Sequence, residues 1–479
     1  MTSPRPENGS RVRAWDYDFK WTPTHCTAAE LRPLVFSYDE LATRCLDRFD
    51  HLLGPSARAK SKTGKEGAAN ACAHSGFPDL YELLRTRAPE DDTLQELWDQ
   101  VNTVPYWVDW DQIERGQRVF YRYAGPSVVG LIFQSLLGGL ASARIVETLT
   151  RTGGFGVCVA RRRLLETSQH ILDVTDSLPS IQPGGKGFAS SIRVRFLHAS
   201  VRRRILALAR ERPTYYSIPS HGIPINDLDS IGTILAFSAA QIWIAFPRQG
   251  IFLTAAEIED YLALWRYVAY LLGVPPTPYL SSPDAARTMM ESLIFSELDP
   301  SPASQVLANN MLQSMAHQPP LYPSAAFLRA EAHWLNGHAL ADALAVPRPG
   351  VWQTLLVAGQ CLVFMAVCYT RRSVRRWDEA GIARARRVLR SLVVKEGIAA
   401  YGGGGEAMHE LKYVPSLDRI ITAAAVGEKR GDQRAGGRVT MGDGVELRNL
   451  KAVLVACVVV GWVVGLGVRG VLGMLQKLR

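Results

Sequence analysis

The stretch that decides the fold runs from Arg161 to Leu208 and contains two helical patterns separated by a turn. It begins with RRRLLETSQHILDVTD (161–176), continues with SLPSIQPGGKG (177–187), and ends with FASSIRVRFLHASVRRRILAL (188–208). The prolines and glycines of the middle segment interrupt both periodic patterns, so we expect two helices joined by a turn-rich link.

The second of these helices carries a histidine on an apolar stripe. Val194, His198, Val201, Ile205 and Leu208 recur at helical spacing and share one face, while the arginines between positions 193 and 204 fall mostly on the other faces. An inward-facing imidazole needs a hydrogen-bond partner or a metal ion. On spacing alone, a hydrogen-bonded core histidine is the commoner of these two cases.

The first helix places polar residues on one face. Arg163, Thr167, His170 and Val174 follow one another at i, i+4, i+7 and i+11. A helix with an inward arginine and threonine is therefore followed, about thirty residues later, by a helix with the inward His198.

This pair resembles the catalytic domain shared by the rubber oxygenases (latex-clearing proteins) and the endoplasmic-reticulum oxygenase mpaB of mycophenolic acid biosynthesis. Other segments look like landmarks of that family in the family's order, and together they cover roughly Pro105 to Leu344. They are VPYWVDWDQIERGQRVFYRY (104–123), LTRTGGFG (149–156), HGIPINDLDSIGTILAF (221–237) and EDYLALWRYVAYLLGV (259–274).

The resemblance implies a b-type haem. His198 corresponds to the proximal iron ligand of the family, and Arg163 and Thr167 correspond to residues of the haem pocket. Some rubber oxygenases carry a lysine directly before the threonine that can close the sixth iron position, whereas this chain has Glu166 there. The resemblance therefore implies an open or water-bound distal position.

Composition indicates a folded protein. Of the 479 residues, 47% are hydrophobic and 21% are charged, and the length exceeds what one small core usually holds. The net charge is +9, but the chain has no zinc-finger, RNA-recognition or basic-zipper pattern, so we expect no nucleic-acid partner. An anionic membrane surface or haem propionates fit the excess of positive charge at least as well.

Other common sites are not supported by the sequence. The seven cysteines form no CxxC or CxxCH motif, which argues against a disulfide framework, a structural zinc site and covalent haem attachment. Asp227 and Asp229 are interpreted as start-of-helix charges rather than metal ligands. His333 and His338 are five residues apart, which is not the spacing of a helical zinc motif.

Hydrophobic segments near the C-terminus raise the question of a membrane. Ala452–Val468 is uncharged, lies between Lys451 and Arg469, and is at the lower limit of length for crossing a hydrocarbon core of ~30 Å. We interpret it as a membrane anchor, with a buried C-terminal helix as the alternative. The shorter apolar segment Ser127–Leu140 is predicted to be a core helix. For Thr354–Tyr369 a core helix is favoured because the segment is shorter than a span requires, with a membrane-dipping helix as the alternative. The N-terminus lacks the apolar region of a signal peptide, so none is expected.

The predicted architecture is all-α, with a globin-like haem-binding helical core, additional helices and a C-terminal transmembrane helix. The expected organisation is an N-terminal extension (1–76), a catalytic domain (77–345), a C-terminal helical region (346–426), a linker (427–451) and the anchor (452–473). Within the N-terminal extension, the basic segment 56–67 is predicted to be a solvated loop.

The function implied by the resemblance is that of a haem b-dependent oxygenase. Such an enzyme would use O2 to cleave or oxidise a carbon–carbon double bond in a lipophilic, isoprenoid-like substrate. It would be held by a single C-terminal helix in a membrane, which the resemblance suggests is that of the endoplasmic reticulum. The alternatives are a non-catalytic, membrane-associated haem- or lipid-binding protein and a haem-free helical protein.

Overall fold

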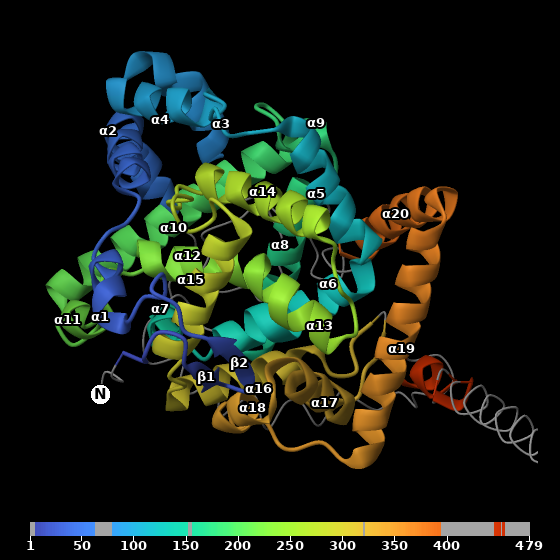
Figure 1. Ribbon diagram of the computed structural model, residues 1–479. Coiled ribbons are helices and arrows are strands. Elements are labelled where there is room, and N and C mark those ends of the chain that lie inside the picture. Colours follow the sequence, from blue (N-terminus) through green and yellow to red (C-terminus); the bar gives the residue numbers. More distant parts are fainter. Residues whose placement is uncertain are drawn as a thin grey trace, which may run out of the picture.

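The computed structural model describes residues 5–62, 79–151, 156–319, 321–393, 445–451 and 453–455 (Figure 1). The described chain is almost entirely helical, which confirms the all-α prediction. The exception within these residues is a short antiparallel hairpin that the sequence did not predict. Its strands β1 (Arg11–Ala14) and β2 (Tyr17–Lys20) pair with Arg11 opposite Lys20.

The helices follow one another in chain order. They are α1 (Ala28–Leu31), η1 (Arg32–Val35), α2 (Glu40–Lys62), α3 (Leu80–Arg87), η2 (Ala88–Glu90), α4 (Asp92–Asn102), α5 (Trp110–Arg122), α6 (Ala124–Gly130), η3 (Leu131–Leu137), α7 (Ala143–Arg151), α8 (Val157–Thr175), α9 (Leu178–Ile181), α10 (Lys186–Glu211), α11 (Ile218–His221), α12 (Asp227–Phe237), η4 (Gln241–Ala245), α13 (Phe246–Arg248), α14 (Ala255–Leu271), α15 (Pro283–Ser296), α16 (Pro302–Met315), α17 (Ala325–Asn336), α18 (His338–Ala343), α19 (Val351–Ser373) and α20 (Arg375–Arg390). The expected helix pair of the 161–208 stretch is present as α8 and α10, joined by α9 and a turn.

Helices α5 and α14 form the closest pair at the centre of the molecule (Figure 1). Gly116 permits this approach, because a methyl group there would collide with the backbone carbonyl of Asp260. Arg115 strengthens the pair by donating from Nε and Nη2 to the Asp260 carboxylate, both at 3.0 Å. Helix α14 begins at a capping box formed by Thr254 and Glu257, which explains its clear start in the sequence.

The N-terminal segment is part of the main core. Helix α2 packs against α10, and its residues Ala42, Leu46 and Phe49 are buried in the same hydrophobic cluster as the residues of α5, α10 and α14. The loop predicted at 56–67 is helical as far as Lys62, and the rest of it lies outside the described residues.

A second hydrophobic cluster lies beside the first. It joins η3, α7, α8 and α16 to α17 and α18, with Leu137, Met311 and Leu335 fully buried. Helix α8 therefore has one side in this cluster through Leu164 and another against α10. This position places the first half of the deciding stretch between the two cores.

Two π-helical segments interrupt the helices predicted at 127–140 and 230–243. The first segment is buried, as predicted for a core helix, but its centre, η3, has π geometry. It packs against the second, η4, and Gln241 Nε2 donates a hydrogen bond of 2.8 Å to Ser135 Oγ between them. Such turns are often found at functional sites.

Helix α19 is only partly covered by the protein. Among the described residues, two helical stretches are long and apolar enough to cross a membrane, Asp227–Arg248 and Val351–Ser373. The first is 61% buried over its most apolar window, whereas the second is 33% buried. Of the predicted linker (427–451) the structure describes residues 445–451, which are helical, and of the predicted anchor it describes residues 453–455.

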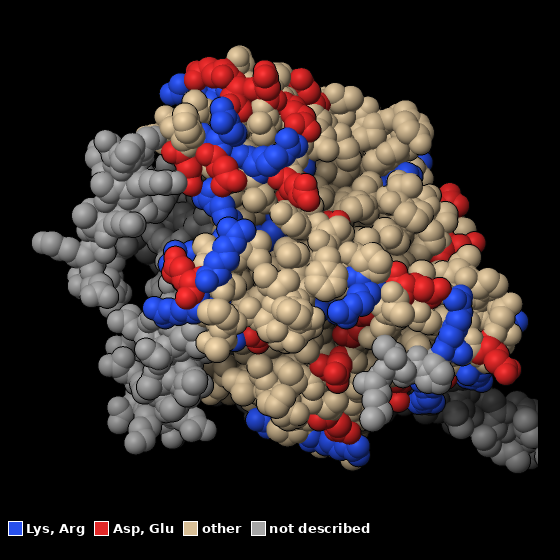
Figure 2. All heavy atoms as spheres, turned by 90° about the vertical axis from the view of Figure 1, so that its left-hand side faces the viewer, with Lys and Arg blue, Asp and Glu red and all other residues tan. Residues whose placement is uncertain are grey.

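Charges on the face made by the N-terminal elements are mixed. Figure 2 shows this face, which is the left-hand side of Figure 1, with acidic and basic side chains interspersed near the top and a broad uncharged area below. On this face the net positive charge of the chain does not gather into a single-sign patch of the kind that nucleic acids select.

Candidate functional site

Helices α8 and α10 run antiparallel, and two contacts set their register. Near the connecting turn, a Cβ atom on Gly187 would lie 2.5 Å from the carbonyl oxygen of Asp173, so the backbones touch there. Three residues farther along each helix, Ser190 Oγ lies 2.9 Å from Nδ1 of His170. Both contacts fit a single antiparallel register, in which each step backward along α8 matches a step forward along α10.

The predicted site residues lie farther from the turn on the same two helices, Arg163 and Thr167 on α8 and His198 on α10. Arg163 and Thr167 share the α8 face that carries His170, because residues three, four and seven apart lie on one side of a helix. The hydrogen bond between His170 and Ser190 shows that this face of α8 meets α10 near the turn. A constant register would bring Arg163 to the level of Leu197 and His198, and the proposed site depends on this prediction.

Exposure changes along this pair of helices. His170 and Ser190 are buried, whereas Arg163, Thr167 and His198 are half-buried. The predicted site residues are therefore less covered than the residues near the connecting turn. The stripe on α10 is partly covered: Ile205 is buried, and Val201 and Leu208 pack in the same cluster.

The turn end of the pair is held firmly. Ser180 Oγ donates to the carbonyl oxygen of Asp173 at 2.7 Å and accepts from the Gly187 amide at 3.1 Å. The Asp173 carboxylate also lies 3.1 Å from Nζ of Lys186 at the start of α10. The two helices are thus clamped at one end and accessible toward the other.

Buried arginines secure the side of α10 that carries His198, since Arg195 lies three residues before it and Arg202 four residues after it. Arg195 donates from Nε and Nη2 to the Asp39 carboxylate at 2.7 and 2.8 Å, and its side chain is only 3% exposed. Arg202 donates to the carbonyl oxygens of Pro224 and Ile225 at 3.2 and 2.8 Å. These contacts fix the rotation of α10 about its axis and thereby the direction in which His198 points.

The electrostatics of Arg163 suit an anionic ligand. Desolvation lowers the pKa of its guanidinium, and Glu166 opposes that shift through its charge. The Glu166 carboxylate is itself engaged, because it accepts a hydrogen bond of 2.8 Å from Arg162 Nε. A partly desolvated arginine gains from a nearby anion, such as the propionate of a haem. The imidazole, the guanidinium and the hydroxyl of Thr167 are a donor set that fits a haem b pocket.

Residues 121–368, just over half of the chain, match the family described as "ER-bound oxygenase mpaB/B'/Rubber oxygenase, catalytic domain". The chain belongs to this family. The matched residues include α8, α10 and all of the predicted site residues, and they extend into α19.

Individual relatives support the same assignment. A rubber oxygenase of Streptomyces sp. (strain K30) is 25% identical over 230 residues, which are 47% of this chain and 53% of that protein. The match thus spans about half the length of that relative. A latex-clearing protein solved in the closed state covers 74% of this chain with 91% of its own, at a TM-score of 0.51 and 17% identity. At this identity the structural likeness concerns the fold.

Other histidines of this family member have different surroundings. His25 is buried, and its Nε2 lies 3.0 Å from the Glu291 carboxylate. His221 lies at the end of α11 against the ring of Tyr216. His333 and His338 approach through their Nδ1 atoms at 3.1 Å. Within the described residues, no three His, Cys, Asp or Glu side chains gather as metal ligands, so the zinc interpretation rejected from spacing gains no support.

The two aspartates at the start of α12 were interpreted as helix-start charges. Both lie in its first turn, although the capping side chain is Asn226, which accepts a hydrogen bond from the Asp229 amide. Asp229 also forms a buried ion pair of 3.0 Å with Arg144. These contacts give both aspartates a structural role.

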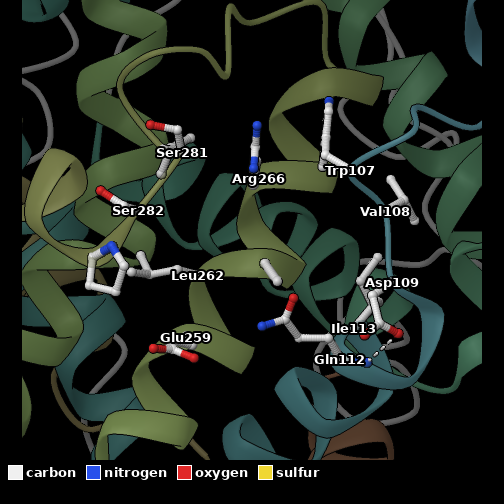
Figure 3. A pocket seen from close by; sticks show the side chains of 13 residues that line it. Trp107, Val108, Asp109, Gln112, Ile113, Glu259, Leu262, Arg266, Ser281 and Ser282 are labelled. Carbon is white, nitrogen blue, oxygen red and sulfur yellow. Dashed lines mark hydrogen bonds between the residues drawn. The ribbon is translucent and has the colours of Figure 1, made fainter.

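A separate pocket opens between α5, α14 and the loop before α15 (Figure 3). Its volume is about 220 Å³, and the Arg266 guanidinium lies over the Trp107 ring at 4.1 Å from the ring centre. Gln112 and Glu259 point into the same space. The volume is below the usual range of ligand pockets, and none of the predicted site residues lines it.

Sequence reasoning missed the residues that position the site. Asp39 lies far upstream of Arg195, so no local pattern connects the two. The arginines beside the His198 stripe were a usable signal, because an arginine at helical spacing from apolar positions can be buried and then requires a carboxylate partner.

Proposed function

We propose that this chain is a haem b-dependent oxygenase that uses O2 to cleave or otherwise oxidise a carbon–carbon double bond in a lipophilic, isoprenoid-like substrate. The observation that supports the proposal is the antiparallel register of α8 and α10, the two helices that carry Arg163, Thr167 and His198. Family membership and the relationship to a rubber oxygenase support the reaction class.

The residues have distinct proposed roles. His198 would hold the iron, and its helix is held in rotation by the Arg195–Asp39 pair. Arg163 would bind a propionate, and Thr167 would donate a hydrogen bond next to the reacting atoms. Bound haem would supply the activation of O2. Glu166 is hydrogen-bonded to Arg162 and would not act as a second protein ligand.

Replacement of the proposed ligand tests the assignment. We expect His198→Ala to lose stoichiometric haem, measured by Soret absorbance and by the haem-to-protein ratio, because the iron–nitrogen bond disappears. His221→Ala and His170→Ala are controls that should keep haem, and thermal unfolding of each variant reports whether it folds. Full occupancy with an unchanged Soret band in His198→Ala would contradict the ligand role. Bound haem without oxidation of any isoprenoid would favour the non-catalytic alternative.

We also propose that residues 452–473 form a single C-terminal membrane anchor, with the endoplasmic reticulum as the membrane. The description of the family as ER-bound supports this, as do the exposed fractions of Leu454 (56%) and Val455 (62%) at the start of the segment. The proposed organisation keeps 1–76 as an N-terminal extension, 77–345 as the catalytic domain, 346–426 as a helical region and 427–451 as the linker.

Membrane extraction tests the anchor. The full chain should sediment with membranes and resist carbonate, whereas a chain ending near Gly444 should remain in the supernatant. Recovery of the full chain in the soluble fraction would mean that the segment is a helix of the soluble core.

A further inference from the structure

Helix α19 is apolar, yet much of its surface is not covered by other parts of the protein. Its 23 residues have a mean hydropathy of 1.8 over the most apolar window, the higher of the two apolar stretches in the described chain, yet only 33% of that window is buried. The less apolar stretch Asp227–Arg248 is 61% buried. An apolar helix in the core of a soluble protein is expected to be mostly covered, so the surface of α19 requires an explanation.

Most of the exposed apolar residues of α19 form one stripe. Val351 (79% exposed), Leu355 (45%), Leu362 (40%) and Tyr369 (37%) lie at i, i+4, i+11 and i+18, and Trp352 (49%) borders them. These positions fall on one face of a helix. The opposite side holds most of the buried residues of the helix, with Val367 (38% exposed) as an exception. The apolar stripe therefore runs along nearly the whole length of α19.

Both ends of α19 are held by the same body of the protein, which decides between crossing a membrane and lying on one. The helix packs against α17 and leads into α20, which packs against α5. There Arg122 binds the Asp378 carboxylate at 2.8 and 2.7 Å, and Arg372 donates to the hydroxyl of Tyr123 at 2.9 Å. A helix that is tied to the folded domain at each end cannot span a bilayer alone. It can present one face to the interface.

Arginines lie next to the stripe. Helix α20 has six arginines and two acidic residues among its sixteen, and α19 itself ends in Arg371 and Arg372. Trp377 is 54% exposed and Val388 46% exposed on α20. Val388 also lines an open hollow together with Arg384, Arg387 and Arg390. Aliphatic, tryptophan and arginine side chains in proximity are the composition that binds an anionic lipid interface.

The helical segment at 445–451 also packs against α19. The helix at 445–451 lies against α19, since a Cβ atom on Gly359 would meet the Asn449 carbonyl at 2.6 Å and Val453 Cγ2 at 2.6 Å. Leu454 and Val455 are exposed and lead into the uncharged segment that ends at Val468. Figure 1 shows α19, α20 and this helix together on the right-hand side, opposite α2 and α4.

We propose that the exposed stripe of α19 and the arginine-bearing surface of α20 form a peripheral binding surface for an anionic lipid bilayer. This surface would seat the catalytic domain against the membrane instead of leaving it free on a linker. The inference extends the anchorage proposed above, because the anchor brings the surface to the membrane, but the surface makes its own contact. A second copy of the chain, or residues 394–444 of the same chain, would be the alternative occupants.

Site-specific photo-crosslinking identifies the occupant. Benzoylphenylalanine would replace Trp352 or Trp377 in the full-length protein, reconstituted in vesicles of phosphatidylcholine with phosphatidylserine. Tyr106, which is 99% exposed and precedes α5, is the control position. We expect lipid adducts, detected by mass, from positions 352 and 377 and none from position 106. Replacing Arg384 with Ser should lower the adduct at position 377 by about fivefold, because one cation near an anionic surface contributes on the order of 1 kcal/mol.

The outcomes separate this proposal from the anchor. If the protein sediments with the vesicles but positions 352 and 377 react only within the chain or with a second copy, the surface proposal is wrong and the anchor stands. Equal lipid adducts at all three positions would likewise overturn it. Failure of the full chain to bind vesicles would reject both. None of these readouts depends on haem, so they leave the oxygenase proposal to its own test.

Discussion

A single methyl group should separate the helices that carry the proposed site. In Gly187→Ala, the new Cβ would lie 2.5 Å from the Asp173 carbonyl oxygen and 2.9 Å from the Val174 Cα. Ordinary contact begins at 3.4 Å, so α8 and α10 would have to part by about 0.9 Å. The same movement would lengthen the 2.9 Å contact between His170 and Ser190 beyond hydrogen-bond distance.

The expected effect is a loss of about 2 kcal/mol in the free energy of unfolding. Overpacking typically costs about 1–3 kcal/mol and the lost hydrogen bond about 1 kcal/mol, while replacing a helical glycine with alanine returns about 0.5–1 kcal/mol. Gly232→Ala is the matched control, because its Cβ would meet only Leu293 Cδ1 at 3.5 Å. That variant should be more stable than the wild type by about 0.5–1 kcal/mol.

Urea denaturation followed by tryptophan fluorescence measures both variants, and haemin titration reports whether the altered spacing reaches the Arg163 end. A Gly187→Ala protein as stable as the wild type, beside a Gly232→Ala control that gains stability, would refute the close backbone contact and the register built on it.

Three further predictions concern separate contacts. Thr167→Val should keep haem but lower oxidation of an accepted substrate by about a hundredfold, measured as turnover per bound haem, and unchanged turnover would leave Thr167 a structural residue. Burial raises the pKa of Glu331 to about 8, so the folded protein holds a proton that the unfolded chain releases above its ordinary pKa of 4.5. Stability should therefore fall as pH rises from about 5 to 8, by up to about 1.4 kcal/mol per pH unit, and this slope should be smaller in Glu331→Gln, as urea titrations at several pH values would show. Asp39→Ala should cost about 3–5 kcal/mol of unfolding free energy, because it leaves Arg195 buried without its carboxylate. Asp47→Ala, which removes one partner of an exposed ion pair, should cost less than about 1 kcal/mol. Equal costs in the two variants would argue against burial as the cause.

Helix positions were predictable where the apolar period was regular and the ends carried capping residues. Helices α3, α4 and α14 are of this kind: their apolar residues recur at intervals of three and four, and their N-caps Asp79, Asp91 and Thr254 accept backbone hydrogen bonds. The π turns in η3 and η4 were not predictable, because one extra residue per turn leaves the composition of a buried helix unchanged.

The sequence predicted which residues belong to the candidate site but not how deeply they and their neighbours are buried. Periodicity placed His198 and Val194 on one face, and the structure keeps them there, but both are half-buried rather than sealed. The buried positions include Arg195 and Arg202, which a hydropathy pattern assigns to solvent. Their burial depends on partners such as Asp39, and a long-range ion pair leaves no trace in local spacing.

For residues 354–369 the sequence could not decide between a core helix and a membrane-dipping one. Hydropathy reports how apolar a segment is but not what covers it. In α19 the covered face holds Val357 and Cys361, whereas Val351 and Leu355 face outward. Length alone favoured a core helix, because the apolar run was shorter than a span. A surface helix that meets lipid on one side has the same composition.

The dependence of α10 on Asp39 also bears on the order in which the protein is made. Asp39 precedes Arg195 by 156 residues. At synthesis rates of about 5–20 residues per second, α2 waits roughly ten to thirty seconds after leaving the ribosome before its partner helix exists. During that interval Phe49, whose ring centre lies 5.5 Å from that of Phe196 in the folded protein, lacks this partner, and only α3 and α4 are available to cover α2. Docking of α10 therefore completes the burial of a segment that has long been synthesised.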